Sequence, residues 1–408
     1  MILDLINKKR LGKELSYKEL DYFFNAYLEG EVADYQMSAM LMAICCNGMT
    51  DEETYALTKI FIDSGDILDF SDIPGVCVDK HSTGGIGDKT TLVIVPIVAA
   101  CGGTVIKMSG RGLGYTGGTI DKLESIPGYK INLTDSQIIK QVHEIGAVIT
   151  GQTADLVPMD KVIYSLRDVT ATVSSIPLIA SSIMSKKIAG GAEKIIIDIK
   201  VGKGALLNKK EDAKKLSELM VKIGEFYNRE VRTIISDMNT PLGNSIGNSL
   251  EVLEAIDVLK GREKDNSFYD LCIELSTNMV SMALNISMEE AKEKVLSVIA
   301  DKSAYKKFEE IVEHQKGDLS GIKVSHNTYK IISPYSGTIE AIDALELGKL
   351  SLRLGAGKEK INDKIDYSVG IRLNKYLGDT VKRGDVLATI YYNKNKIDVN
   401  VDNIYKIN

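Results

Sequence analysis

The sequence predicts an α/β protein in which a helical segment is followed by a mostly parallel sheet with its helices and then by a small β-rich domain. Three observations support this fold class. Residues 1–66 show only helical patterns, residues from 75 onward alternate short β-rich runs with helices, and residues 331–408 alternate strands with turns. Alternating strands and helices favour right-handed βαβ crossovers, which place successive strands parallel in one sheet.

The first segment contains helices with recognisable start and stop signals. The stretch SYKELDYFFNAYLEG opens with Ser16, and Glu19 follows three residues later, which is a capping-box pattern. The stretch DYQMSAMLMAICCNGM ends at Asn-Gly, and TDEETYALTKIFIDSG has a cap, acidic residues in its first turn and a glycine stop. These signals predict a helical domain at the start of the chain.

The middle of the chain carries the predicted sheet, with strands in GVCVDK, GTVIKMSG, GAVITG, EKIIIDIKVG and REVRTIISDM. A second helical stretch interrupts this pattern. We therefore expect a helical domain made of residues 1–66 and 159–190, an α/β domain made of residues 72–158 and 191–330, and a β-rich C-terminal domain, residues 331–408.

Composition and charge exclude several classes of function. The net charge of −6 and the pI of about 5.5 argue against nucleic acid as a partner, because the broad basic surface that phosphate backbones require is absent. The N-terminus carries charges among its apolar positions, so we do not expect a signal peptide. No run of about 18 apolar residues occurs, so we expect no membrane-spanning helix.

The chain has five cysteines, an odd number with no C-x-x-C spacing. This usage is typical of buried thiols in a cytoplasmic protein, and it fits neither a disulfide framework nor a zinc site. We expect a cytoplasmic location.

Glycines gather where a ligand would bind. Between Gly84 and Gly118, ten of 35 residues are glycine, against two or three expected from an average usage of about 7%. Eight of the ten form two clusters, HSTGGIGDKTT and MSGRGLGYTGGT, each directly after a predicted strand. Strand ends of a parallel sheet share one edge, and glycine turns there let backbone N–H groups approach an anion. The side chains available to such a phosphate cradle are Lys80, Ser82, Thr91, Ser109 and Thr119. The alternative is that the glycines only make tight turns.

Four stretches, DKHSTGGIGDKTT, KMSGRGLGYTGGTIDKLESIPG, GQTADLVPMDKVIYSLRDVTATVSSIPLIASSIMSKKIAGGA and ISDMNTPLGNSIGNSLEVLEAI, resemble the thymidine and pyrimidine-nucleoside phosphorylases. The resemblance covers nearly the whole chain. It implies a helical domain and an α/β domain separated by a cleft, with a small α+β C-terminal domain, usually in a homodimer. It also implies reversible phosphorolysis of a pyrimidine nucleoside to free base and (deoxy)ribose 1-phosphate.

The resemblance assigns roles to the residues of the glycine-rich block. It implies phosphate binding by Lys80, His81, Ser82, Thr91, Lys107, Met108, Ser109 and Thr119. In the family the histidine that matches His81 points at the pyrimidine O2, where a proton or a strong hydrogen bond would stabilise the departing base. The alternative for His81 is a side chain that only caps the turn.

A second set of residues is implied to bind the base. Ser182 and Lys186 lie four apart on a predicted helix and therefore on one face. By resemblance Arg167, Ser182 and Lys186 contact the uracil edge, while Tyr164 and Leu113 line the pocket. His81, Arg167 and Lys186 are the expected catalytic residues. Without the resemblance, Lys186 would be interpreted as part of a solvated helix end.

The resemblance also implies a monovalent cation, usually potassium. Its ligands would be backbone oxygens of Gly87, Lys89, Leu242 and Ser245 and the carboxylate of Glu254. Of these, the sequence itself can check only Glu254. We expect inorganic phosphate as the co-substrate and no organic cofactor.

Two other classes of protein share some of these features. A phosphoribosyltransferase of the anthranilate type would share a related architecture, but it needs acidic residues for magnesium, and the Lys80-His81-Ser82 turn disfavours it. The stretches SPYSGTIEAI and GDTVKRGDVLATI are similar to the turn of biotinyl and lipoyl carriers. No lysine stands there in the setting that a carrier needs, so we interpret this domain as structural.

Lys107 bears on which sugars are accepted. Relatives restricted to deoxynucleosides tend to carry an apolar residue there, and strand alternation puts Lys107 and Ser109 on the same side. A polar neighbourhood would tolerate a 2′-hydroxyl. We therefore expect both uridine and thymidine as substrates, as well as deoxyuridine. The alternatives are a thymidine phosphorylase restricted to deoxynucleosides and a Lys107 that only adds charge at the phosphate site.

Overall fold

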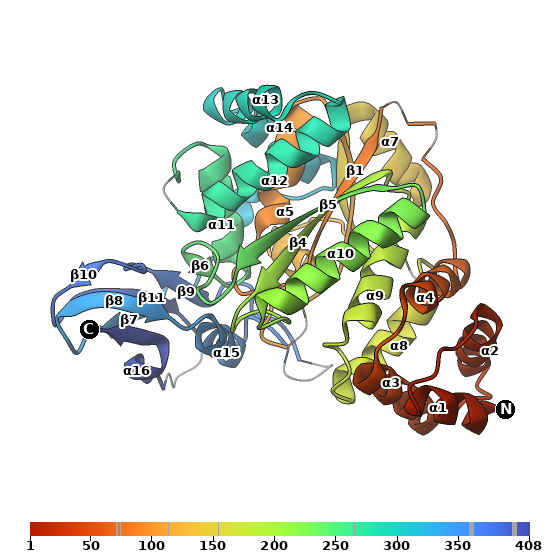
Figure 1. Cartoon of the computed structure of the whole chain (residues 1–408). Helices are drawn as coiled ribbons and strands as arrows, with labels where there is room; N and C mark the ends of the chain where they lie inside the picture. The colour runs from red at the N-terminus through yellow and green to blue at the C-terminus, as the bar shows by residue number, and fades with distance from the viewer. Residues whose placement is uncertain are drawn as a thin grey trace. The chain divides into compact units, whose positions relative to one another are not determined.

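The computed structural model describes residues 1–408 except 71, 74, 113, 154, 265, 359–362 and 394–397. The chain forms two compact units (Figure 1). The helical unit contains residues 1–72, 153–195 and 210–233, and the α/β unit contains residues 73–152, 196–209 and 234–408. A helical N-terminal domain, a parallel-sheet domain and a small C-terminal domain with antiparallel sheets are present, which confirms the predicted fold class.

Seven helices of the described chain build the helical unit. They are α1 (Ile2–Arg10), α2 (Tyr17–Leu28), α3 (Asp34–Asn47), α4 (Asp51–Asp63), α8 (Pro158–Val169), α9 (Ile176–Ala189) and α10 (Lys210–Phe226). Helix α9 is buried along most of its length and packs against α4 and α10. The capping box predicted at Ser16 and Glu19 is formed, and a second one starts α4. Local capping and burial of α9 therefore hold together segments that are far apart in the sequence.

The main sheet has the strand order β3-β2-β1-β4-β5. The strands are β1 (Cys77–Ser82), β2 (Thr104–Ser109), β3 (Ala147–Gly151), β4 (Lys194–Val201) and β5 (Glu230–Asp237). Strands β1, β2 and β3 are parallel neighbours, so their carboxyl ends, with the turns that follow, meet at one edge.

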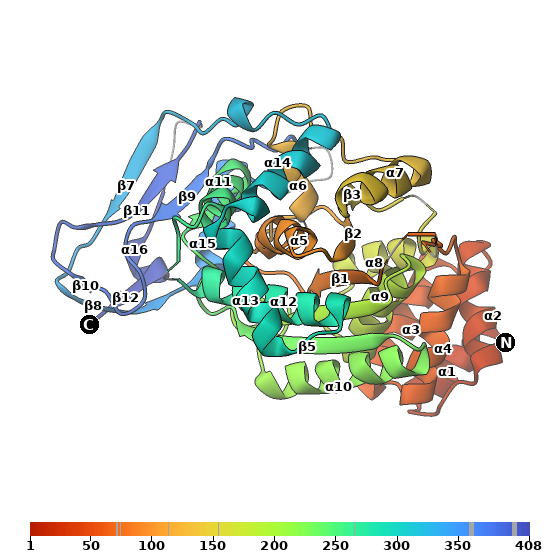
Figure 2. The ribbon, with the colours of Figure 1, turned by 90° about the horizontal axis from the view of Figure 1, so that it is seen from above.

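Several helices of the α/β unit pack on this sheet and on one another. They are α5 (Thr90–Ala100), α6 (Thr119–Glu124), α7 (Asp135–Ile145), α11 (Asn248–Leu259), α12 (Ser267–Leu284), α13 (Met288–Ala300) and α14 (Ser303–His314). Helix α5 is buried from Thr90 to Ala99 because α11, α12, α13 and α14 pack around it (Figure 2). Its continuous apolar sequence is explained by this position at the centre of the core.

Two antiparallel sheets form the C-terminal part. Their strand orders are β10-β8-β12 and β6-β9-β11-β7. The elements are β7 (Thr328–Ile332), β8 (Gly337–Ile342), α15 (Ala344–Leu354), β9 (Gly370–Leu373), β10 (Thr380–Val381), β11 (Val386–Tyr391), α16 (Val401–Ile404) and β12 (Tyr405–Ile407), after a 3₁₀ turn at Leu319–Gly321. Strand β6 (Ser245–Ile246) comes from the middle of the chain and pairs with β9.

Within the described ranges, no helix combines the length and the apolar character that crossing a bilayer requires.

Candidate active site

Lys80 is the centre of a buried charge network at the end of β1. Its ammonium donates to the hydroxyl of Thr90 at 2.6 Å, and it lies 3.9 Å from Asp88 and 3.7 Å from Asp198. Strand alternation turns Lys80 and Ser82 to the same side of β1. Ser82 donates to Asp88 at 2.5 Å, which folds the glycine-rich turn back onto the strand.

Two carboxylates balance the charge of this network. Asp198 on β4 lies 2.7 Å from the ammonium of Lys200 and accepts a hydrogen bond from Ser236. Burial alone would raise the pKa of Asp88, but Lys80, Lys200 and the hydrogen bonds from Ser82 and Thr90 outweigh it, and the pKa lies well below its usual value. Asp88 is therefore ionised at neutral pH.

The network was only partly predicted. Lys80 and Ser82 were expected at a phosphate site, whereas Asp198 and Lys200 were not. A usable signal was present, because EKIIIDIKVG places two charged residues inside an otherwise apolar strand, and buried charges in such a strand are paired.

The second predicted strand end contributes a buried hydroxyl. The side-chain oxygen of Ser109 is buried and has no hydrogen-bond partner among the described residues. Buried hydroxyls are normally bonded, so this one is a candidate ligand group. Thr91 is buried in the first turn of α5, and Thr119 begins α6.

Lys107 and Met108 precede Ser109 on β2, and both are buried. The ammonium of Lys107 donates to the carbonyl of Met108 at 2.9 Å and lies 3.8 Å from Asp79 on β1. His81 is half-buried at the end of β1, on the same side of that strand as Asp79.

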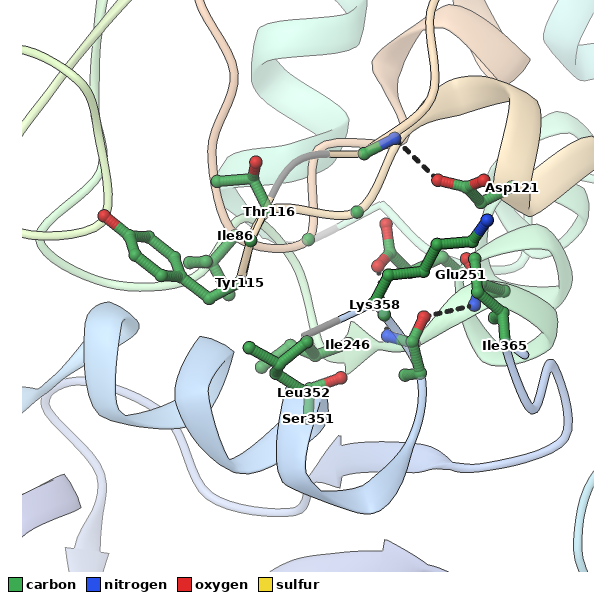
Figure 3. Close-up of a pocket in the computed structure, with 18 of the residues that line it drawn as sticks. Ile86, Tyr115, Thr116, Asp121, Ile246, Glu251, Ser351, Leu352, Lys358 and Ile365 are labelled. Carbon is green, nitrogen blue, oxygen red and sulfur yellow. Dashed lines mark hydrogen bonds between the residues drawn. The ribbon is translucent and has the colours of Figure 1, made fainter. Parts of the chain in front are cut away.

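The second glycine cluster lines a separate pocket (Figure 3). The amide of Gly112 donates to Asp121 at 2.6 Å, and the pocket continues to Glu251 on α11 and to Lys358. Tyr115 lies at its rim with its ring turned away from the other labelled side chains (Figure 3). Leu113, expected to line the base pocket, lies outside the described residues.

In the helical unit, the predicted base-binding residues come from α8 and α9. The ammonium of Lys186 donates to Ser182 at 3.2 Å, as the four-residue spacing predicted, and it lies 2.7 Å from Asp160. It also lies 5.6 Å from the centre of the Tyr164 ring. The structure therefore brings Ser182, Lys186 and Tyr164 together.

Asp160 was missed by the sequence analysis. Its side chain is fully buried, whereas Lys186 is 20% exposed, so the ion pair presents its cationic end toward solvent. The signal was a spacing of four residues between Asp160 and Tyr164, which puts them on one face of the predicted helix.

Arg167 has a different environment. Its guanidinium is 1% exposed and donates to the carbonyls of Thr172, Val173 and Leu178. Burial lowers its pKa from the ordinary value. It lies 5.5 Å from the Tyr164 ring centre, so it belongs to the same cluster as Lys186. Two of its bonded N–H groups donate to the segment between α8 and α9 and the third donates to α9. Among the described residues, two of its five N–H groups remain for a ligand.

The residues expected to hold potassium meet in the α/β unit, but in an unexpected way. The side chain of Lys89 points into the set, and its ammonium donates to the carbonyls of Leu242 at 2.7 Å and Ser245 at 3.1 Å. It also lies 2.7 Å from Glu254. These oxygens are three of the five expected ligands, so the set does not fit an additional potassium ion.

Three family models match successive parts of the chain. The helical bundle domain of the glycosyl transferase family matches residues 3–65, and the a/b domain of that family matches residues 75–305. The pyrimidine nucleoside phosphorylase C-terminal domain matches residues 338–407.

Curated proteins are similar over almost the full length. A pyrimidine-nucleoside phosphorylase from Staphylococcus haemolyticus is 48% identical over 97% of this chain and 93% of its own length. One from Bacillus subtilis is 46% identical over 99% of this chain and 95% of its own length. A solved structure of anthranilate phosphoribosyltransferase from Thermus thermophilus has a TM-score of 0.61 at 18% identity, covering 77% of this chain and 100% of that one. This last likeness shows a shared fold.

Proposed function

The chain belongs to the pyrimidine-nucleoside phosphorylase family, and from that premise we propose that it catalyses the reversible phosphorolysis of pyrimidine nucleosides. Phosphate attacks C1′ of the sugar, the bond from C1′ to the base nitrogen breaks, and the products are free base and (deoxy)ribose 1-phosphate. Such a reaction requires a held phosphate and a site that stabilises the negative charge of the departing base.

The observation that carries the proposal is the buried hydroxyl of Ser109, which has no partner among the described residues and ends the strand that neighbours the Lys80 network. We assign phosphate binding to the residues at this edge of the sheet. They are Lys80, His81, Ser82, Thr91, Lys107, Met108, Ser109 and Thr119. Lys80 supplies the main positive charge, and the hydroxyls of Ser82, Thr91, Ser109 and Thr119 supply donors.

The base is assigned to the α8–α9 cluster. Lys186 and Arg167 place two cationic donors beside the ring of Tyr164, which suits the pyrimidine oxygens as they gain negative charge. His81 is assigned to the pyrimidine O2 as a proton or hydrogen-bond donor to the leaving base. We assign Ser182, which accepts a hydrogen bond from Lys186, to the pyrimidine ring nitrogen.

The remaining requirements are part of the same proposal. Inorganic phosphate is the co-substrate, and the chemistry needs no organic cofactor. We propose a cytoplasmic homodimer that acts on uridine, deoxyuridine and thymidine. Potassium is left out of this assignment, because Lys89 contacts three of the oxygens expected to bind it.

The test is an assay for free base with uridine, thymidine, cytidine and inosine, each with and without phosphate. Release of uracil and thymine that depends on phosphate is expected, with inosine left intact. A Ser109→Ala variant should raise the KM for phosphate and leave the KM for the nucleoside close to that of the parent. Phosphate-dependent turnover without magnesium would exclude the phosphoribosyltransferase alternative, and a requirement for magnesium would favour it.

A further inference from the structure

Lys89 stands directly before the first turn of α5, and its side chain is fully buried. A buried ammonium is costly unless each of its donors is bonded and its charge is balanced. Lys89 meets both conditions. Its three N–H groups have three oxygen neighbours, the carbonyls of Leu242 and Ser245 and one carboxylate oxygen of Glu254.

These three oxygens would also suit a monovalent metal ion. Backbone carbonyls replace the water shell of potassium in proteins, and a single carboxylate balances its charge. Glu254 is positioned for this by the neighbouring backbone, because its two oxygens accept from the amides of Asn244 at 2.7 Å and Ser245 at 2.8 Å. We call the group formed by the oxygens of Leu242, Ser245 and Glu254 the oxygen cage. Its single carboxylate is balanced by one positive charge.

We propose that the ammonium of Lys89 is the resident cation of the oxygen cage, so that this phosphorylase needs no potassium for its fold or its activity. An ammonium has the same single charge as potassium and approaches oxygen to about 2.7–2.9 Å when charge-assisted. Two of the three contacts of Lys89 have that length. The proposal does not depend on which nucleoside is cleaved.

The chain packs closely around the cage. Gly87 and Gly243 both have positive φ, and a Cβ added at Gly87 would clash with the Leu242 carbonyl, whereas one added at Gly243 would clash with Glu254. The ring of Phe268 lies 4.7 Å from the ammonium and offers its face to the cation.

The oxygen cage is connected to the proposed phosphate site through Lys89. Lys89 follows Asp88 and precedes Thr90, both of which bond to the Lys80 network. Glu254 lies on α11, and Ser245 begins β6. Loss of the cation would leave Glu254 as an uncompensated buried charge and would loosen the turn that carries Asp88.

The test uses Lys89→Ala, which removes the ammonium and opens the cage, and Lys89→Met, which removes the charge but keeps a side chain of similar length. The melting temperature of each is measured in potassium, sodium and tetramethylammonium chloride at equal ionic strength. The parent should melt at the same temperature in all three salts. Lys89→Ala should be several degrees more stable in potassium than in tetramethylammonium, because an ion that binds only the folded state stabilises it. Lys89→Met should respond to none of them.

Lys122 provides a matched control. Its ammonium is as deeply buried, lies 3.3 Å from Glu251 on the same helix α11, and donates to the carbonyl of Gly117. Lys122→Ala should lower the melting temperature equally in every salt, since one carbonyl accompanies that pair among the described residues.

Activity gives a second readout. The kcat/KM of the parent should agree within about twofold between potassium and tetramethylammonium, whereas that of Lys89→Ala should rise with potassium. A rubidium ion should bind in the cage of Lys89→Ala and give an anomalous diffraction signal there. A parent that needs potassium, or a folded Lys89→Ala variant whose melting temperature is the same in every salt, would overturn the proposal.

Discussion

Lys80 in the α/β unit and Arg167 in the helical unit are both buried cations, yet they are held in opposite ways. Lys80 is 2% exposed and its neighbours are the side chains of Thr90, Asp88 and Asp198. Arg167 is 1% exposed, and its guanidinium donates instead to the main-chain carbonyls of the segment between α8 and α9 and of the start of α9.

The difference matters because side-chain partners can rotate and exchange for an incoming anion, whereas main-chain carbonyls cannot move without moving the backbone. The side chains around Lys80 can therefore give way to an anion that binds its ammonium. Arg167 stabilises the segment between α8 and α9 through hydrogen bonds to its carbonyls, and it also faces the Tyr164 ring. Substitution should consequently affect ligand binding at the first site and both binding and stability at the second.

The largest effect is expected for His81→Ala, which separates the leaving-group role from the Lys80 network on the same strand. Loss of a positioned acid lowers turnover by about 10²–10⁴-fold, and the KM for phosphate should stay close to that of the parent because the network is intact. His314, which bonds to the Glu310 carbonyl on α14, provides the control. If kcat for His81→Ala stays within about threefold of the parent, the assigned role is wrong.

Arg167→Ala tests whether the backbone contacts of Arg167 stabilise the fold. If this variant loses only nucleoside binding, the contrast drawn with Lys80 is wrong. We expect kcat/KM for the nucleoside to fall by about 10²-fold, and unfolding to become easier by about 2–3 kcal/mol because three carbonyls lose a charged donor. Activity assays and chemical denaturation measure the two effects separately. A variant with parental stability would mean that the carbonyl contacts are dispensable.

Lys186→Met should reduce nucleoside binding less than Arg167→Ala does. It leaves the fully buried Asp160 without its cation, so both stability and nucleoside affinity should fall, the latter by about tenfold. The double variant Asp160→Asn, Lys186→Met removes the unpaired charge. It should recover stability while nucleoside affinity stays low, and recovery of both would remove Lys186 from the base site.

The smallest effect is expected for Lys107→Met, which keeps the strand and removes one charge beside Asp79. The ratio of kcat/KM for uridine to that for thymidine should fall by up to about tenfold, because a 2′-hydroxyl loses its polar neighbour. A variant that loses uridine, deoxyuridine and thymidine equally would leave Lys107 as a phosphate ligand only. A parent that rejects uridine would contradict the broad sugar tolerance proposed here.

The fold was predictable because its signals are local. Caps at Ser16 and Thr50 and the alternation of strands and helices each depend on a few neighbouring residues. Strand β6 was not predictable, since two residues carry no periodicity and their partner β9 lies far along the chain.

The candidate site was predictable in its residue types and less so in its contacts. Motifs indicated Lys80, Arg167 and Lys186, but a motif does not say whether a cation is bonded to side chains or to the backbone. Lys89 is the clearest case. Its carbonyl was expected as a ligand, whereas its ammonium lies among the ligands, and only the direction of the side chain decides between the two.

Ser245 contacts residues that are synthesised early and residues that are synthesised late. It pairs through β6 with Arg372 on β9, gives its carbonyl to Lys89 and gives its amide to Glu254. During synthesis on the ribosome, the sheet neighbour of β6 emerges only after most of the chain has been made. Vectorial folding can therefore assemble α5 and the strands around it early, but it cannot complete the backbone around Lys89 until β9 arrives. A chain stalled before residue 370 still contains Glu254, but without β9 the hydrogen bond from the Ser245 amide to Glu254 should open more often. This amide should therefore exchange faster in the stalled chain than in the released protein.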